Sequence, residues 1–221
     1  GGVDDRQICQ ARQRFGSTVM DPIAFIAGFY RRGERAYEVL CRHGEAVAEK
    51  ALATADAVSD QNPDREFICQ AAMLHDIGIF MTDCPGLGCH GLHPYVCHGI
   101  LGARLLSEAG LKRHSRVCER HVGVGITAKD VRRQGLPLPE RDMIPQTLEE
   151  TIVCYADKFF SKNAPAQRPL SMDAILRGLQ QFGPDKAERF SRWAEIFEPG
   201  GSPTGSGGPS RFAFGRKTCE R

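Results

Sequence analysis

The 221-residue chain has no apolar run that approaches the length of a membrane span, which takes about 20 residues. Its first residues show no signal-peptide pattern. An excess of one charge is also missing, because 29 basic and 27 acidic residues leave a formal net charge of +2. Broad nucleic-acid binding needs a concentrated basic face. These absences predict a protein with neither a membrane nor bulk nucleic acid as its partner.

Paired cysteines are missing as well. The nine cysteines are odd in number and include no Cys-x-x-Cys pair, so their spacing indicates no disulfide framework. Cys41, Cys69, Cys118 and Cys154 fall within apolar helical patterns, where a thiol packs as a small hydrophobic group. We therefore expect reduced thiols and a cytoplasmic location.

Segments that alternate between apolar and polar residues are absent, whereas apolar residues recur at helical spacing. A hydrophobic content of 41% and a charged content of 25% are ordinary for a globular domain of this length. We predict an all-α fold with a single helical bundle. The expected organisation is an N-terminal extension over 1–20, a helical domain over 21–198 and a flexible Gly/Pro/Ser-rich tail over 199–221.

Start and stop signals divide the domain into helices. Asp21-Pro22 resembles a cap followed by proline at the first helical position, and Thr147-x-x-Glu150 is a capping-box pattern. Residues 123–146, rich in glycine, proline and charge, are expected to form a loop of unusual length, and such loops are often functional. Beyond the helix that starts at 21, we expect helices over about 34–58, 62–78, 94–110, 115–122, 147–160, 172–182 and 185–197.

The doublet His75-Asp76 stands out because it ends an apolar segment that starts at Ala71. An imidazole beside a carboxylate is costly to bury unless something binds both groups. A divalent metal would do so, since the imidazole supplies nitrogen and the carboxylate supplies oxygen that can bridge two ions. The doublet therefore indicates a metal site.

Asp157 poses a similar problem, because it shares a helical face with Val153 and Phe160. A carboxylate buried there without a partner would cost several kcal/mol or take up a proton. Lys158 is expected to point to another side of the helix, so it would not neutralise this carboxylate. Metal ligation resolves the conflict.

Three further histidines, His43, His98 and His121, lie on or beside apolar helical faces. A lone histidine in such a place is more often a core residue than a ligand, so the evidence comes from the whole group. Together with the doublet and Asp157, these histidines form a nitrogen and oxygen donor set without thiolate. Such a set suits Fe, Mn, Co, Ni or catalytic Zn better than a structural zinc site.

The order of these residues resembles the HD-domain superfamily of metal-dependent phosphohydrolases. The stretch Leu74-His75-Asp76-Ile77-Gly78 is similar to its HDIG subgroup, and the resemblance covers about 34–162, a little over half of the chain. It implies a helical domain with one or two divalent ions. In that arrangement a first metal is held by His43, His75, Asp76 and Asp157, and Asp76 bridges to a second metal that is held by His98 and His121.

Two departures from the family pattern bear on the chemistry. Some dinuclear members carry a further histidine beside the last metal histidine, whereas Arg120 and Val122 stand there in this chain. Many members carry a lysine a few residues beyond the doublet, whereas Ile79, Phe80 and Met81 occupy that stretch. The first departure leaves coordination positions open for water or substrate. The second removes a familiar phosphate or acid partner.

Basic residues near the expected ligands are candidates to replace the missing lysine as partners of a phosphate or an acid group. Lys158 and Arg42 each adjoin a proposed ligand in the sequence. We predict that Asp76 and Lys158 act in catalysis and that Arg42 binds substrate. Lys129, in the expected long loop, could close over a substrate. For the neighbouring Arg132 and Arg133, a solvated surface charge is the favoured interpretation.

The segment 84–98 is rich in cysteine and histidine. Its spacing matches no zinc motif, although an additional zinc or a redox-sensitive lid are alternatives for it. We expect His90 and His93 to line the mouth of the site, as proton donors or substrate contacts.

The resemblance implies hydrolysis of a phosphate ester, that of a nucleotide or a related small molecule. Two other functions stay open at this point: a di-iron oxygenase that uses the same ligands, and a sensor or binding domain that keeps the metal without turnover. No sequence feature requires a particular oligomeric state, and a homodimer is common among helical domains of this size.

Overall fold

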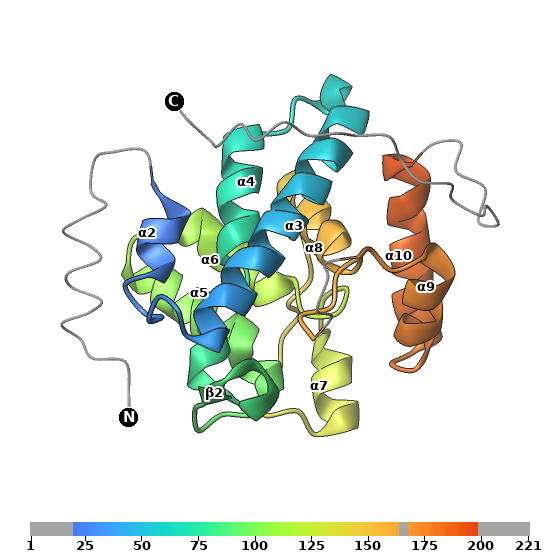
Figure 1. Cartoon of the computed structure of the whole chain (residues 1–221). Coiled ribbons are helices and arrows are strands. Elements are labelled where there is room, and N and C mark those ends of the chain that lie inside the picture. The colour runs from blue at the N-terminus through green and yellow to red at the C-terminus, as the bar shows by residue number, and fades with distance from the viewer. Residues whose placement is uncertain (1–19, 164–167, 199–221) are drawn as a thin grey trace.

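The computed structural model describes residues 20–163 and 168–198, to which all structural statements here refer. The fold is all-α, as the sequence predicts (Figure 1). Met20 is the one described residue of the predicted N-terminal extension, and the predicted tail lies outside the described residues. The helices are α2 (Pro22–Ile26), α3 (Arg35–Ala57), α4 (Arg65–Leu74), α5 (His98–Glu108), α6 (Lys112–Arg120), α7 (Ala128–Gln134), α8 (Leu148–Asp157), α9 (Met172–Gln180) and α10 (Pro184–Phe197).

Short elements connect these helices. The strands β1 (Asp83–Cys84) and β2 (Cys89–His90) form a small antiparallel hairpin with Cys84 opposite Cys89. The 3₁₀ segments are η1 (Ser59–Gln61), η2 (Ile77–Met81), η3 (Pro85–Leu87) and η4 (Tyr95–Cys97).

Local sequence explains where several helices begin. The Asp21 carboxylate accepts hydrogen bonds from the backbone N–H groups of Ile23 and Ala24, with proline next in the chain. The Thr147 side chain caps α8 as predicted. The Glu150 carboxylate does not complete that capping box, because it accepts hydrogen bonds from the Gln146 backbone and from Arg120.

The expectation of a long loop over 123–146 is wrong, because α7 lies within it. The reason is a full capping box, in which Thr127 and Asp130 satisfy each other's backbone N–H groups. The frequent glycine, proline and charge around it hid this pattern. The predicted helix over 62–78 also ends earlier, at Leu74, where the chain turns into η2.

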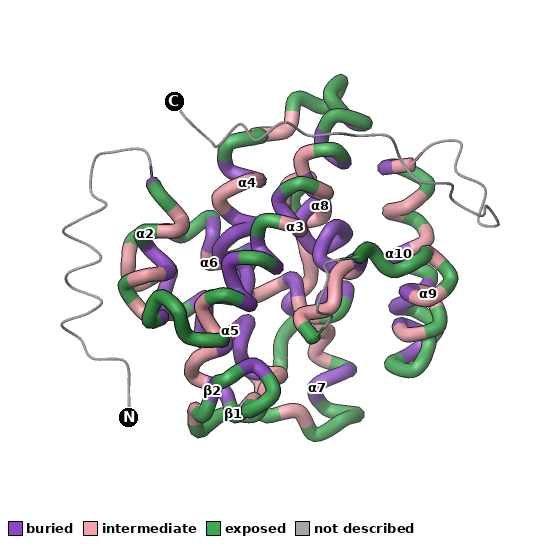
Figure 2. The backbone as a smooth tube through the Cα atoms, in the orientation of Figure 1, coloured by how far each residue is buried: buried purple, intermediate pink, exposed green. Residues whose placement is uncertain are grey.

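The long helix α3 forms the centre of the fold and packs against α4 and α8 (Figure 1). Its 23 residues correspond to a length of about 34 Å. Buried side chains lie on the facing surfaces of these helices, among them Val47, Ile68 and Ile152, while the outer faces are exposed (Figure 2). The core therefore lies along α3.

The pair α9 and α10 covers one side of this core. Its contact is aromatic: Tyr155 of α8 stacks on Phe190 of α10 with ring centroids 4.9 Å apart, and Phe197 adds a tilted contact at 5.1 Å. Aromatic rings bury large apolar areas, so this contact anchors the C-terminal pair.

Among the described residues, the helices are too short or too polar to cross a membrane.

Candidate metal centre

The six predicted ligands come from five helices or their ends, and the fold brings them together. His43 lies in the middle of α3, and Asp157 is the last residue of α8. The other four lie where helices end or begin, at the C-terminal ends of α4 and α6 and at the start of α5. All six are buried, with 4% or less of their surface exposed: His43, His75, Asp76, His98, His121 and Asp157.

The ligand atoms form two groups that share Asp76. His43, His75, Asp76 and Asp157 make one group, and Asp76, His98 and His121 make the other, with the atoms of each group within 4.8 Å of one another. The two groups have the same members as the two ligand sets that the family resemblance implies, and their binding of metal stays a prediction.

Asp76 uses a different oxygen for each group. Its Oδ2 lies 3.1 Å from His75 Nε2, whereas its Oδ1 lies 3.3 Å from both His98 Nε2 and His121 Nε2. A carboxylate in this position can bridge two ions. The geometry therefore fits the bridging role that the family resemblance implies for Asp76.

The ring orientation of three histidines is fixed by the backbone. The Nδ1 atoms of His75, His98 and His121 lie 2.6–2.8 Å from the carbonyl oxygen three residues earlier in the chain. An Nδ1–H that donates to a carbonyl leaves Nε2 to face the cluster, which is the usual arrangement of a metal-bound histidine. These helix ends therefore orient the rings as well as placing them.

Several buried polar atoms in the cluster have no hydrogen-bond partner. They include Asp76 Oδ1 and the Nε2 of His75, whereas Asp76 Oδ2 has an ion pair with Lys162. The Nε2 atoms of His98 and His121 lie 3.1 Å apart, and at most one of them can donate to the other. Unsatisfied buried polar groups are costly. A divalent cation would satisfy these atoms, so the residues present fit a metal.

Burial and nearby charge set the pKa values of these groups. Burial lowers the pKa of His121 to about 4. Burial also disfavours charge on His75, but the carboxylates of Asp76 and Asp157 raise the pKa of His75 to about 9. The carboxylates thus hold a positive charge at this place, and a metal ion can replace the proton that His75 would otherwise carry.

Gly78, which follows the doublet, brings η2 and α5 into close contact. A Cβ atom at this position would lie 2.2 Å from the His98 carbonyl oxygen and 2.4 Å from the Gly102 backbone nitrogen. Real side-chain carbons do not approach backbone atoms so closely, so only glycine fits here. This contact fixes His98 relative to the doublet and thereby couples the two ligand groups.

Lys162 is the functional residue that sequence reasoning missed. Its Nζ lies 2.7 Å from Asp76 Oδ2, and it donates a hydrogen bond to the Tyr95 hydroxyl. It therefore brings an ammonium group to the carboxylate where the family's usual lysine is lacking. No motif spacing connects Lys162 to the doublet. The available signal was its position five residues after Asp157 in the sequence.

The expectation that Lys158 points away from Asp157 is wrong. The Nζ of Lys158 lies 2.7 Å from Asp157 Oδ2. The helix α8 ends at Asp157, and the long side chain of the capping lysine reaches back to the carboxylate. Lys158 thus lies at the cluster, and its catalytic role stays a prediction.

The other proposed substrate contacts lie on the surface. Arg42 is exposed on α3, and Lys129 is exposed on α7. His90, in β2, and His93 are exposed too, so their contact with a substrate stays a prediction. In the described part of the chain, neither group of possible metal ligands includes Cys84, Cys89 or these two histidines, so no separate zinc site forms there.

The two arginines that follow Lys129 make ion pairs. Arg132 pairs with Glu140, and Arg133 lies 3.2 Å from Asp130. Both arginines therefore have structural partners, as the surface-charge interpretation expects. The seven described cysteines are all free thiols, and the reduced state of the protein stays a prediction.

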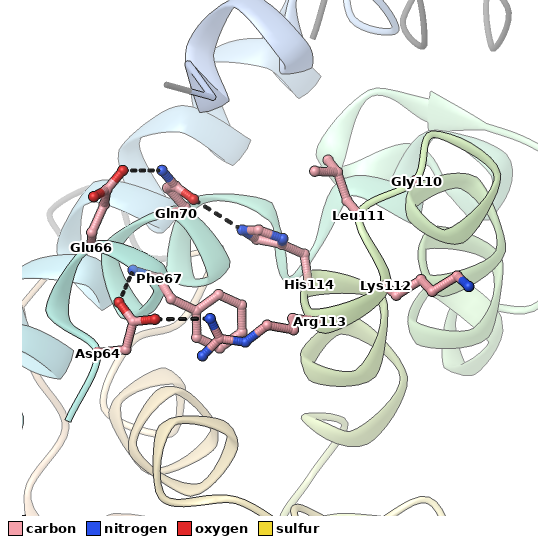
Figure 3. Close-up of a pocket in the computed structure, with 9 residues that line it drawn as sticks. All are labelled: Asp64, Glu66, Phe67, Gln70, Gly110, Leu111, Lys112, Arg113 and His114. Atoms are coloured by element: carbon pink, nitrogen blue, oxygen red, sulfur yellow. Dashed lines mark hydrogen bonds and ion pairs between the residues drawn. The ribbon is translucent and has the colours of Figure 1, made fainter. Parts of the chain in front are cut away.

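A groove of about 410 Å³ lies at the other end of α4 (Figure 3). It is lined by Asp64, Phe67 and Gln70 from α4 and its cap, and by Arg113 and His114 from α6. None of the six proposed ligands lines it. Asp64 and His75 flank the ten residues of α4, which places the groove about 15 Å from the cluster.

Comparison with known proteins gives partial matches. No family model matches the chain. The chain is 34% identical over 131 residues to a tRNA (cytidine(56)-2'-O)-methyltransferase of Picrophilus torridus, covering 59% of this chain and 34% of the relative. A methyltransferase with the same description from Thermoplasma volcanium is 30% identical over 165 residues, 74% of this chain and 42% of the relative.

A third relative, an uncharacterized protein of Methanocaldococcus jannaschii, is 37% identical over 123 residues, 54% of this chain and 65% of the relative. The chain therefore spans from about a third to somewhat under two thirds of the length of these curated relatives.

Among solved structures, the HD domain of the L. monocytogenes phosphodiesterase PgpH is similar to this chain at 17% identity and a TM-score of 0.43. The match covers 71% of this chain and 89% of that chain. A likeness this distant carries no functional conclusion. The all-α fold and the buried cluster of this chain agree with the HD-domain resemblance through their own geometry, whereas the HDIG assignment stays a prediction.

Proposed function

We propose that this chain is an HD-type, metal-dependent phosphohydrolase that cleaves the phosphate ester of a nucleotide or a related small molecule. The proposal rests on the position of Asp76. Each of its two carboxylate oxygens faces a separate group of buried candidate ligands. Two cation positions that share one carboxylate suit phosphate-ester hydrolysis, because one substrate can be contacted from both sides.

The first ion would be held by His43, His75, Asp76 and Asp157, and the second by Asp76, His98 and His121. When bound, such ions acidify a water molecule and neutralise negative charge on phosphate oxygens. The donor set of nitrogen and oxygen is compatible with Fe, Mn, Co, Ni or Zn.

Lys162 would supply the charge that the substrate needs from the protein itself. Its side chain is 15% exposed, so the ammonium group is partly shielded from water but can still meet a ligand. A fixed cation in a shielded site stabilises negative charge that develops on phosphate or on the leaving oxygen. Tyr95 holds this ammonium group from the side of α5, and Lys158 adds a second cation beside Asp157.

The names of two relatives refer to methyl transfer, and we propose that this chain corresponds to a separate unit of those proteins. The matched region covers 34% and 42% of these relatives. It also covers 65% of a relative that carries no such name. A unit that occurs both in relatives named as methyltransferases and in a relative without that name is better explained by a function of its own. The buried cluster supports this interpretation.

One experiment distinguishes the phosphohydrolase from the two alternatives, a di-iron oxygenase and a metal-containing sensor. The protein would be purified, its metal content measured, and phosphate release followed with Mn²⁺ or Co²⁺ over a panel of nucleotides and simple phosphate esters. We expect one to two bound ions per chain and metal-dependent release of phosphate.

Dioxygen consumption by an anaerobically iron-loaded sample, without phosphate release, would replace the hydrolase with the oxygenase. Tight metal retention with no activity over the panel would replace it with the sensor. Absence of bound metal would overturn all three.

A further inference from the structure

A second cavity, of about 390 Å³, lies beside the metal centre. It is bounded by the start of α5, the stretch that follows α6, the helix α7 and the C-terminal pair α9 and α10 (Figure 1). These elements are far apart in the sequence, so the cavity exists only in the folded chain. Its volume is within the range of small-molecule binding sites.

Two residues belong both to this cavity and to the surroundings of the metal centre. His98, a proposed ligand of the second ion, forms part of the wall, and so does Tyr95. The two rings lie with centroids 4.7 Å apart, and the Tyr95 hydroxyl accepts a hydrogen bond from Lys162. A molecule in the cavity would therefore reach the second ligand group directly.

Apolar groups make up most of the remaining wall. Leu136 contributes its side chain from the stretch after α7, and Leu179 and Phe182 contribute theirs from α9 and the turn that follows it. Gly123 and Gly125 have φ angles of 66° and 88°, a left-handed conformation that glycine adopts without strain, and they bring backbone to the wall. Such a surface favours an apolar ring over a hydrated chain.

One buried ion pair forms the charged part of the cavity wall. Lys186 of α10 is 5% exposed, and its ammonium group pairs with the carboxylate of Asp130. Asp130 also accepts hydrogen bonds from Thr127 and Arg133, so its position is fixed. The paired charges cancel, and no further charged carboxylate or ammonium lines this cavity. A second phosphate or another charged group would therefore gain little here.

From this arrangement we infer that the cavity binds the alcohol part of the substrate, and that this part is uncharged and carries an apolar ring. The inference rests on the proposed phosphohydrolase function and adds a substrate class to it. The phosphate group would lie at the metal centre, while the ring fills the cavity between Leu136, Leu179 and Phe182. A spare hydrogen of the Lys186 ammonium group can donate to an acceptor on the ring.

The first experiment compares two phosphate esters with the metal-loaded full chain. Benzyl phosphate and glycerol phosphate both release a primary alcohol, so their bonds have similar intrinsic reactivity, but only benzyl phosphate carries a ring. We expect kcat/KM for benzyl phosphate to exceed that for glycerol phosphate about tenfold or more, since an apolar contact discriminates at this level. Equal values would overturn the inference.

A variant and its matched control test whether this cavity causes the preference for benzyl phosphate. Phe182 lines the cavity and is 59% exposed, so Phe182→Ser should fold. Ile196 on α10 is 51% exposed and does not line the cavity, which makes Ile196→Ser the control. We expect Phe182→Ser to reduce the benzyl-to-glycerol ratio about tenfold and Ile196→Ser to keep it. A ratio unchanged in Phe182→Ser would contradict the assignment of this cavity.

A binding measurement separates this inference from the proposed function. Benzyl alcohol is titrated into the wild-type protein, and the methyl resonances of Leu136 and Leu179 are followed by NMR, with glycerol as the comparison. Saturable shifts with benzyl alcohol, but no hydrolysis of either ester, would disprove the phosphohydrolase and keep the cavity as a ring-binding site. Hydrolysis of both esters without such shifts would disprove the cavity assignment and keep the phosphohydrolase.

Discussion

Two regions of this protein contain histidine and aspartate side chains close together, but only one of them has unsatisfied groups. In the groove at the start of α4, Asp64 pairs with Arg113, and His114 lies 3.2 Å from the amide oxygen of Gln70 (Figure 3). In the buried cluster at the other end of α4, Asp76 Oδ1 and His75 Nε2 have no hydrogen-bond partner, and Asp76 Oδ2 pairs with Lys162 alone among the described lysines and arginines.

The two regions contain the same types of residue. What distinguishes the candidate ligand site is that some of its buried polar atoms lack hydrogen-bond partners. A polar group that is buried without a partner costs free energy, whereas one that is paired at a surface costs little. The groove is therefore explained by its own internal contacts. The cluster is explained only if something else binds there, and this is why the metal proposal rests on it.

Asp76→Ala gives the largest expected effect, because it removes the carboxylate that the two ligand groups share. We expect loss of both bound ions and of all metal-dependent phosphate release, measured by elemental analysis and by the phosphate assay. Asp64→Ala is the matched control at the groove. It should keep metal and activity and lose about 1 kcal/mol of stability, because Asp64 caps α4. Normal metal content in Asp76→Ala would contradict the assignment.

Gly78→Ala tests whether the close contact between the doublet and α5 holds the two groups together. The added methyl group would overlap the His98 carbonyl, so the free energy of unfolding should fall by about 3 kcal/mol. Gly86→Ala serves as the control, since a Cβ there has no atom within 4 Å. Chemical denaturation of both variants measures the difference. Equal stability would show that the contact is not tight.

Lys162→Met tests the lysine that the structure places at Asp76. Removing one fixed charge from a shielded site lowers kcat by about a hundredfold or more, so we expect a loss of this order with ions still bound. Lys112→Met, which changes an exposed lysine on α6, is the comparison. Lys162→Arg should recover part of the rate if charge is what matters. A kcat equal to that of the wild type would remove Lys162 from the mechanism.

His114→Gln tests whether the buried histidine of the groove makes stability depend on pH. Burial lowers the pKa of His114 from 6.5 to about 4. The unfolded chain therefore binds a proton that the folded chain does not, and stability falls as the pH decreases from 6.5 to 4. The contribution is about 3 kcal/mol at the acidic end.

Glutamine does not titrate and keeps a polar partner for Gln70, so the variant should lose less stability than the wild type over the same pH range. Thermal or denaturant unfolding at pH 7 and pH 4 measures this. Parallel pH profiles of the two proteins would show that His114 titrates normally.

Local signals explain why much of the fold could be predicted. The predicted helix over 34–58 matches Arg35–Ala57, and the predicted helix over 185–197 matches Pro184–Phe197 to within one residue at each end. Apolar spacing and caps act over a few residues, so they are visible in the sequence. The helix α7 was missed because its capping box lies among residues that usually form loops.

The sequence by itself determined most of the helices and the set of six candidate metal ligands, since helical periodicity and ligand chemistry depend on residue type and order. Only the tertiary structure decided that Lys162 reaches Asp76, that Lys158 turns back to Asp157, and that Lys186 and Asp130 pair beside His98. These contacts join segments through long, flexible side chains. Their partners are fixed by how helices pack against one another, and no local spacing in the sequence records that packing.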